Sequence, residues 1–159
     1  MNAPRTKRPT LLVPVDFGDP SRSALAQAKK LGEALGAEVV LLHVYARPKH
    51  GDAGMAAVLF PVLPDDAAAS AERELAKQGL TEGVSRVIVR EGEPADAILN
   101  AVAELAPVMV IMGSHGRSGL SRALLGSVAE NVVRHATVPV LVVPDSVERG
   151  TRTMLSRSA

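Results

Sequence analysis

The sequence predicts an α/β protein with a doubly wound, five-stranded parallel sheet and helices on both of its faces. Short apolar segments alternate along the chain with longer segments whose apolar residues recur every three or four positions. The first kind of segment is typical of buried strands and the second of amphipathic helices. Regular alternation of the two favours parallel pairing, because each helix carries the chain back across the sheet.

The amino-terminal part of the chain begins this alternation. A strand is expected at Thr10–Val15, followed by a helix with Asp19 as N-cap and Pro20 at its first helical position. We expect this helix to end at Gly36 and to bury one apolar stripe, made of Ala24, Leu25, Ala28, Leu31 and Leu35. The second strand, expected at Glu38–Val44, is apolar almost throughout, as a strand covered on both faces should be.

The rest of the chain continues the pattern after a long connection. Residues 45–63 place glycines and prolines around the apolar stretch Met55–Phe60, and a connection of this length usually forms a lid or binding segment or is disordered. Helices are then expected from 65 to about 78, from Glu93-Pro94 to the residue before Pro107, and from Ser127 to about 136. The remaining strands are expected at 85–90, 108–112 and 139–143.

Length and composition limit the class of protein. A chain of 159 residues that is 47% hydrophobic can form one domain with a full core, which we place at 10–144 between a polar arm at 1–9 and a tail at 145–159. The 18 Lys and Arg nearly balance the 17 Asp and Glu, which argues against nucleic acid and anionic membranes as partners. The lack of cysteine and of a long apolar run predicts a cytoplasmic protein without a membrane-spanning segment.

The strongest functional signal is the loop between the fourth predicted strand and the fourth predicted helix. It reads Gly113-Ser-His-Gly116-Arg-Ser-Gly119-Leu-Ser-Arg-Ala-Leu-Leu-Gly126-Ser127. A glycine-bearing loop in this position is typical of anion sites, because unpaired helix N–H groups and the helix dipole favour negative charge. Glycine also lets the backbone approach a ligand with no Cβ in the way. We therefore expect a nucleotide phosphate site here.

Ser127 has a second interpretation that is compatible with the first. Ser127 and Glu130 match a capping box, in which Ser127 is the N-cap of the helix. Such a box would explain Ser127 in any helix, but it does not explain glycine at 113, 116 and 126 together. A capped helix start also points its N–H groups at a phosphate.

The spacing Gly113-x2-Gly116-x9-Gly126-Ser127 resembles the ATP-binding signature of the universal stress protein family. The resemblance extends to Leu11–Phe17, Val39–Val44 and Val138–Pro144, and covers roughly residues 9 to 144. It implies the strand order 3-2-1-4-5, with a ligand crevice outside the carboxyl ends of the first and fourth strands. It also implies an adenine-nucleotide site formed by Pro14, Val15, Asp16, Val44, Met112, Gly113, Ser114, His115, Gly116, Arg117, Gly126, Ser127 and Val128. Pro14 and Val44 would line the adenine pocket, with the Val44 backbone bonding the base edge.

Individual polar residues leave alternatives open. The Asp16 carboxylate would repel phosphate unless it bonds a ribose hydroxyl or holds a metal such as Mg²⁺ that bridges to phosphate; it also suits a turn or helix entry. His115 has no second acid or base near it in sequence, so we interpret it as a binding-loop residue and not as a catalytic one. Arg117 fits a phosphate contact and a solvated position equally well. His43, inside an apolar strand, is expected to be a core residue with its polar atoms paired.

These observations favour a binding module, namely a stress regulator that holds ATP, AMP or another adenine nucleotide and acts on an unidentified protein partner. A slow ATPase or phosphotransferase using the same pocket is the enzymatic alternative, disfavoured because no base or nucleophile is evident. A nucleotide-free interaction protein is a third possibility, disfavoured by the intact glycine motif. Val138–Val143 would be an edge strand in the implied order, and we expect it to pair antiparallel with its copy in a two-fold homodimer.

Overall fold

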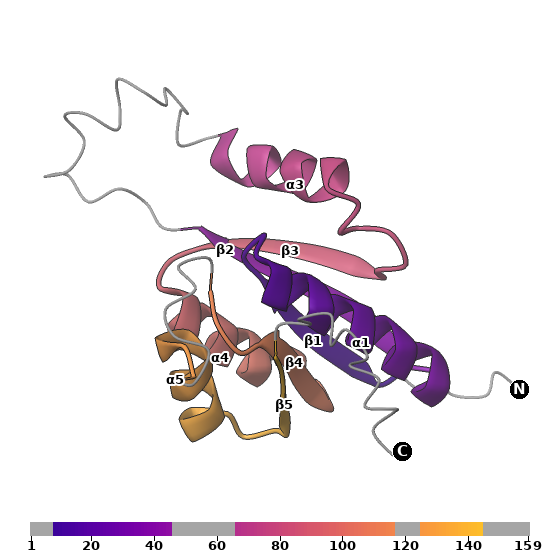
Figure 1. Ribbon diagram of the computed structural model, residues 1–159, viewed down its shortest axis with the longest axis vertical. Coiled ribbons are helices and arrows are strands. Elements are labelled where there is room, and N and C mark those ends of the chain that lie inside the picture. The colour runs from indigo at the N-terminus through magenta and orange to yellow at the C-terminus, as the bar shows by residue number, and fades with distance from the viewer. Residues whose placement is uncertain (1–7, 46–65, 117–124, 145–159) are drawn as a thin grey trace, which may run out of the picture.

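The computed structural model describes residues 8–45, 66–116 and 125–144, which form a parallel sheet with helices on both faces (Figure 1). The strand order β3-β2-β1-β4-β5 confirms the predicted fold class and topology. The strands are β1 (Thr10–Val15), β2 (Glu38–Tyr45), β3 (Arg86–Glu91), β4 (Met109–Gly113) and β5 (Val140–Val143). The helices are α1 (Asp19–Leu35), α3 (Ala67–Lys77), α4 (Pro94–Leu105) and α5 (Ser127–His135). The stretch Met55–Phe60, the tail and most of the amino-terminal arm lie outside the described residues.

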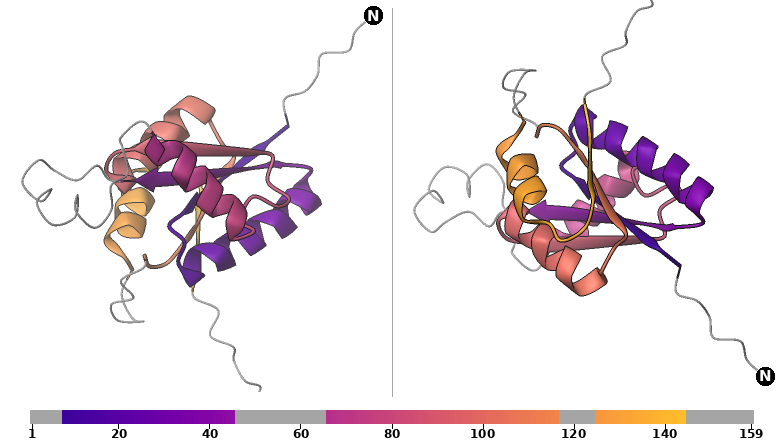
Figure 2. Two further views of the ribbon diagram at one scale, coloured as in Figure 1. Left: turned by 90° about the horizontal axis from the view of Figure 1, so that it is seen from above. Right: turned by 90° about the horizontal axis from the view of Figure 1, so that it is seen from below.

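The sheet has two apolar faces, and each is covered by a different pair of helices (Figure 2). Successive side chains of β1 point to opposite faces, so that Leu11 and Val13 pack with α1 and α3 while Leu12 packs with α4 and α5. All three side chains are fully buried. The central strands are apolar at consecutive positions because neither of their faces meets water.

The ends of α1 differ slightly from the sequence prediction. Gly18 is the N-cap, so Asp19 is the first helical residue and not the cap. The helix ends at Gly36 as predicted, where a φ of 60° suits glycine. Leu35 was predicted to lie on the buried stripe, but as the last residue of α1, directly before the Gly36 cap, it is 55% exposed.

β1 and β4 are paired only near their starts, within the residues that the structure describes. β1 pairs with β2 along its whole length, whereas its pairing with β4 joins Leu11 to Met109 and Leu12 to Val110. The carbonyl of Thr10 accepts a hydrogen bond from the Val108 N–H at 2.9 Å, and because backbone groups alternate sides along a strand, Pro14 also faces β4. Proline has no N–H to continue this ladder. The two strands are therefore free to separate at their carboxyl ends.

Among the described residues, no helix combines the length and the apolar character needed to cross a membrane.

Candidate functional site

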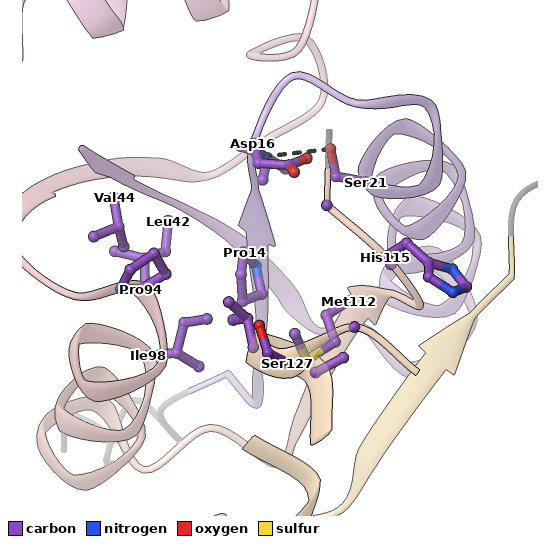
Figure 3. A pocket seen from close by; sticks show the side chains of 16 residues that line it. Pro14, Asp16, Ser21, Leu42, Val44, Pro94, Ile98, Met112, His115 and Ser127 are labelled. Atoms are coloured by element: carbon purple, nitrogen blue, oxygen red, sulfur yellow. Dashed lines mark hydrogen bonds between the residues drawn. The ribbon is translucent and has the colours of Figure 1, made fainter. Parts of the chain in front are cut away.

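A cavity of about 250 Å³ lies at the carboxyl ends of β1 and β4 (Figure 3). Small-molecule sites typically measure about 300–1,000 Å³, so this space approaches the lower end of that range. The structure brings together most of the predicted site residues around it: Pro14, Val15, Asp16, Val44, Met112, Gly113, His115, Gly116, Gly126, Ser127 and Val128. It adds Ser21, Leu42, Pro94, Ile98 and Ala129, which the sequence analysis missed.

One side of the cavity is apolar. Leu42 and Val44 come from β2, Pro94 and Ile98 come from α4, and Pro14 lies beside them (Figure 3). Leu42 and Val44 share a face because they are two residues apart in a strand, and Pro94 and Ile98 share a face because they are four apart in a helix. These spacings were visible in the sequence. A flat heterocycle could shed its hydration against such a wall.

The amino-terminal end of α5 forms a polar part of the wall. Ser127, Val128 and Ala129 line the cavity, and their N–H groups occupy the first helical positions, where no acceptor exists within the helix. No side chain in the described part of the chain caps this helix. The amino terminus of α5 therefore presents backbone donors and the positive end of the helix dipole to the cavity.

The predicted capping box at the start of α5 is wrong. Gly126 is the N-cap, which places Ser127 at the first position inside the helix. The start of the helix is fixed by the backbone, because the Gly126 N–H donates to the Ser114 carbonyl at 2.8 Å and the Glu130 N–H donates to the Gly126 carbonyl at 2.8 Å. Ser127 is therefore free of a capping role and lines the cavity.

The glycines of the loop make room for other parts of the protein. A Cβ on Gly113 would lie 2.7 Å from the Cβ of Pro20, where the start of α1 passes β4. A Cβ on Gly126 would lie 3.3 Å from the Ser114 carbonyl oxygen, and one on Gly116 would lie 3.2 Å from Oδ2 of Asp16. Gly126 has φ −65°, which any residue can adopt. Close packing within the protein thus requires a glycine at 113 and favours one at 116 and 126, in addition to the ligand approach expected from the sequence.

Asp16 is held by the turn that joins β1 to α1. Its Oδ1 accepts a hydrogen bond from the Gly18 N–H at 3.1 Å. Its own N–H donates to Oγ of Ser21 at 3.4 Å, and the Ser21 hydroxyl donates to the Gly18 carbonyl at 2.9 Å. The turn role was one of the alternatives predicted for Asp16. It occupies Oδ1 only, so Oδ2 is left for another partner beside Gly116.

The remaining predicted residues are less central. The ring of His115 points away from Asp16 and Ser127 (Figure 3), and its Nδ1 lies 2.9 Å from Oγ of Ser114. Nε2 of His115 is buried and has no hydrogen-bond partner in the described part of the chain. Ser114 does not line the cavity, although its carbonyl fixes Gly126. Arg117 lies outside the described residues.

The electrostatics of the cavity depend on few groups. Of the described residues that line it, Asp16 is the only carboxylate, and none is lysine or arginine. Across residues 8–45, 66–116 and 125–144, no three His, Cys, Asp or Glu side chains gather as a metal site. The positive end of α5 is therefore the main attraction that the described wall offers to an anion.

The chain is similar to known proteins over most of its length. The model of the universal stress protein family matches residues 7–144. Universal stress protein YxiE of Bacillus subtilis is 32% identical, over 84% of this chain and 97% of that protein. Universal stress protein MJ0577 of Methanocaldococcus jannaschii is 30% identical over 84% of this chain and 93% of that protein. Its solved structure matches with a TM-score of 0.68 at 29% identity, covering 86% of this chain and 95% of that one. A universal stress protein solved in complex with cAMP matches with a TM-score of 0.58 at 26% identity, covering 89% of this chain and 100% of that one.

Proposed function

This chain belongs to the universal stress protein family, and we propose that it binds an adenine nucleotide, such as ATP, between β1 and β4 and acts as a nucleotide-responsive regulator. One observation carries the proposal. A single cavity combines an apolar wall with the uncapped amino terminus of α5 and one carboxylate, which are the surfaces that a base, a phosphate and a ribose require. The relative in complex with cAMP supports an adenine ligand.

In the proposed complex the adenine lies against Leu42, Val44 and Ile98. The phosphates receive hydrogen bonds from the N–H groups of Ser127 and Val128. Oδ2 of Asp16 accepts a hydrogen bond from a ribose hydroxyl, because Oδ1 is already bonded to the Gly18 N–H. In this orientation the apolar base of the nucleotide contacts the apolar wall, and its charged phosphates meet the positive end of the α5 dipole.

The residues present also fit Mg²⁺, with a limited role. Mg²⁺ is commonly held by one or two carboxylates together with phosphate oxygens and water. Asp16 could supply one carboxylate oxygen, and the nucleotide would have to supply further ligands, since the described residues form no metal site by themselves. Bound there, the ion would offset phosphate charge.

The phosphate position can be tested by adding charge at the start of α5. Ser127→Glu places a carboxylate in the first turn of α5, where it interacts favourably with the helix dipole but repels a phosphate. We expect it to preserve the melting temperature while weakening ATP binding by more than about tenfold in calorimetry. Ser127→Gln is the control, because glutamine has nearly the same size as glutamate but no charge. This variant should bind ATP much more tightly than Ser127→Glu.

Binding of adenosine tests the base end of the proposed site separately from the phosphate end. Since it carries no phosphate, its affinity should be similar in Ser127→Glu and Ser127→Gln. Equal ATP affinity in the two folded variants would show that the phosphates do not lie at the amino terminus of α5. A wild-type protein that binds no adenine nucleotide would refute the proposed function.

A further inference from the structure

Two aromatic rings meet behind the turn that carries Asp16. The ring centroids of Phe17 and His43 are 4.6 Å apart and the rings are inclined at 54°. His43 is 8% exposed and Phe17 is partly buried, so the His43 side of this contact is shielded from water. Its Nδ1 lies 2.9 Å from the carbonyl oxygen of Val15, and because a carbonyl only accepts, Nδ1 carries the proton and donates. The last residue of β1 and the second residue after it are thus both held by one imidazole of β2.

Phe17 has a backbone conformation that needs such support. Its φ is 68°, in the left-handed region that residues other than glycine rarely adopt. A strained residue of this kind persists only where the surrounding structure determines it, and such residues concentrate at functional sites. The side chain of Phe17 packs on the same apolar cluster as Val15 and Leu41, on the face of the sheet covered by α1 and α3. Its ring therefore anchors a turn that would otherwise relax.

The turn so anchored controls the position of Asp16. Asp16 lies between Val15, whose carbonyl is bonded to His43, and Phe17, whose ring contacts His43. The hydrogen bond from Gly18 then orients the carboxylate. Phe17 and His43 do not line the cavity themselves, so any effect they have on a ligand must pass through the residues between them.

The geometry points to Phe17 and His43 as positioning residues that hold the Asp16 carboxylate where a bound nucleotide meets it. This inference rests on the proposed function. It assigns a role in binding to two side chains on the face of the sheet opposite the apolar wall. His43 was predicted from the sequence to be a core residue with its polar atoms paired; its burial agrees with that, and the bond to Val15 pairs Nδ1. The contact with Phe17 gives it this second purpose.

A double-mutant cycle with Asp16 tests the inference. Phe17→Gly removes the ring but suits a φ of 68°, so the fold should be retained. We expect it to lower ATP affinity about tenfold when Asp16 is present, because the hydrogen bond to the carboxylate is lost, and less than about twofold in an Asp16→Ala background. His43→Leu keeps an apolar side chain of similar size without the donor, and should show the same dependence on Asp16.

A general loss of stability would behave differently in this cycle. Val39→Ala, a change at a buried position of the same cluster, should lower the melting temperature without altering ATP affinity. If Phe17→Gly and His43→Leu reduce affinity equally with and without Asp16, or leave it unchanged, the positioning role is overturned while the proposed function stands. If the wild-type protein and Asp16→Ala bind ATP equally well, the inference also fails. If wild-type protein binds no ATP, both fall together.

Discussion

At the scale of single residues, Asp16 is the one carboxylate among the described residues that line the cavity. One of its oxygens is committed to the turn, and no lysine, arginine or second carboxylate accompanies it among the described lining residues. Hydrolysis of a nucleotide needs a positioned water and charge stabilisation at the transferred phosphate. We therefore expect the proposed site to hold a nucleotide and to cleave it only slowly.

We expect ATP turnover on the order of one per minute or slower, far below the enzyme median of about 10 per second. A single-turnover assay with labelled ATP and Mg²⁺ measures this directly. Clearance of bound ATP within a second, together with loss of that rate in Asp16→Asn, would contradict the binding role and favour a phosphotransferase or ATPase.

Gly113 is a residue whose importance lies in packing. A Cβ there would come within 2.8 Å of the Pro20 backbone carbon, closer than non-bonded atoms approach, so α1 or β4 would have to move. We expect Gly113→Ala to destabilise the protein by about 1–3 kcal/mol in urea titration. Val108→Ala, at a position 47% exposed just before β4, is the control and should change stability by less than about 0.5 kcal/mol. An unchanged midpoint for Gly113→Ala would mean that α1 is not held against β4.

At the scale of elements, an ion pair ties β3 to α4. Nη1 of Arg90 donates to Oε1 of Glu104 at 3.0 Å, and Nη2 of Arg90 donates to Oε2. Hydrogen bonding from Arg90 is the main cause that lowers the pKa of Glu104 below its ordinary value. Because the folded pKa lies below the unfolded one, the pair contributes stability that is fully present above pH 4.5 or so and is lost as pH falls through the folded pKa.

Urea titrations of the wild-type protein and Glu104→Gln across pH test this contribution. The wild type should be the more stable of the two at pH 7, by a small margin since Glu104 is exposed and Arg90 is only partly buried. The difference should vanish once Glu104 is protonated, and should shrink at pH 7 in 1 M salt. A difference that persists at low pH would show that Glu104 acts through packing and not through charge.

The helices and strands were predictable because the spacing of their apolar residues follows from which side chains are buried. Thr10–Val15 was predicted at its observed bounds. All six of its side chains are buried, and such a strand appears in the sequence as a continuous run of apolar and β-branched residues. Errors occurred at helix starts, at Asp19 and Ser127, because several residues in a row can act as a cap and backbone hydrogen bonds decide among them. Sequence spacing carries no information about those bonds.

The candidate site was predictable on its strands and glycine loop, and less so elsewhere. Pro94 and Ile98 were missed because only the folded topology brings α4 over the crevice. Ser21 was missed because its place at the cavity depends on how the turn after β1 folds. Its hydroxyl donates to the Gly18 carbonyl in that turn, and no spacing in the sequence indicates this bond. Leu42 could have been found from Val44, its neighbour two residues along the same strand.

At the scale of the whole molecule, β5 forms one edge of the sheet in the described part of the chain. The carbonyls of Pro139 and Val143 accept hydrogen bonds from Val110 and Ser114, so the backbone groups of Val140 and Val142 point away from β4. Sheet order leaves β5 at an edge, as predicted. We propose that this edge pairs antiparallel with its copy to form a two-fold homodimer.

Val142→Pro tests the dimer because it removes an outward N–H without breaking a bond to β4. We expect light scattering to give a dimer for the wild-type protein at micromolar concentration and a monomer for the proline variant. Val142→Thr keeps the N–H and the β-branched shape, and should remain dimeric. A monomeric wild type would refute the proposed interface.

The cavity wall combines the first strand with the last helix, and this has a consequence for the order of synthesis. Pro14 leaves the ribosome early, whereas Ser127 and Ala129 emerge only after the residues of β1 to β4 have been made. Until α5 docks, the crevice lacks the helix end that gives it a positive wall. A ligand that depends on those donors would therefore bind only after α5 has docked, and we expect a chain cut before Gly126 to retain most of the apolar wall but none of the α5 donors.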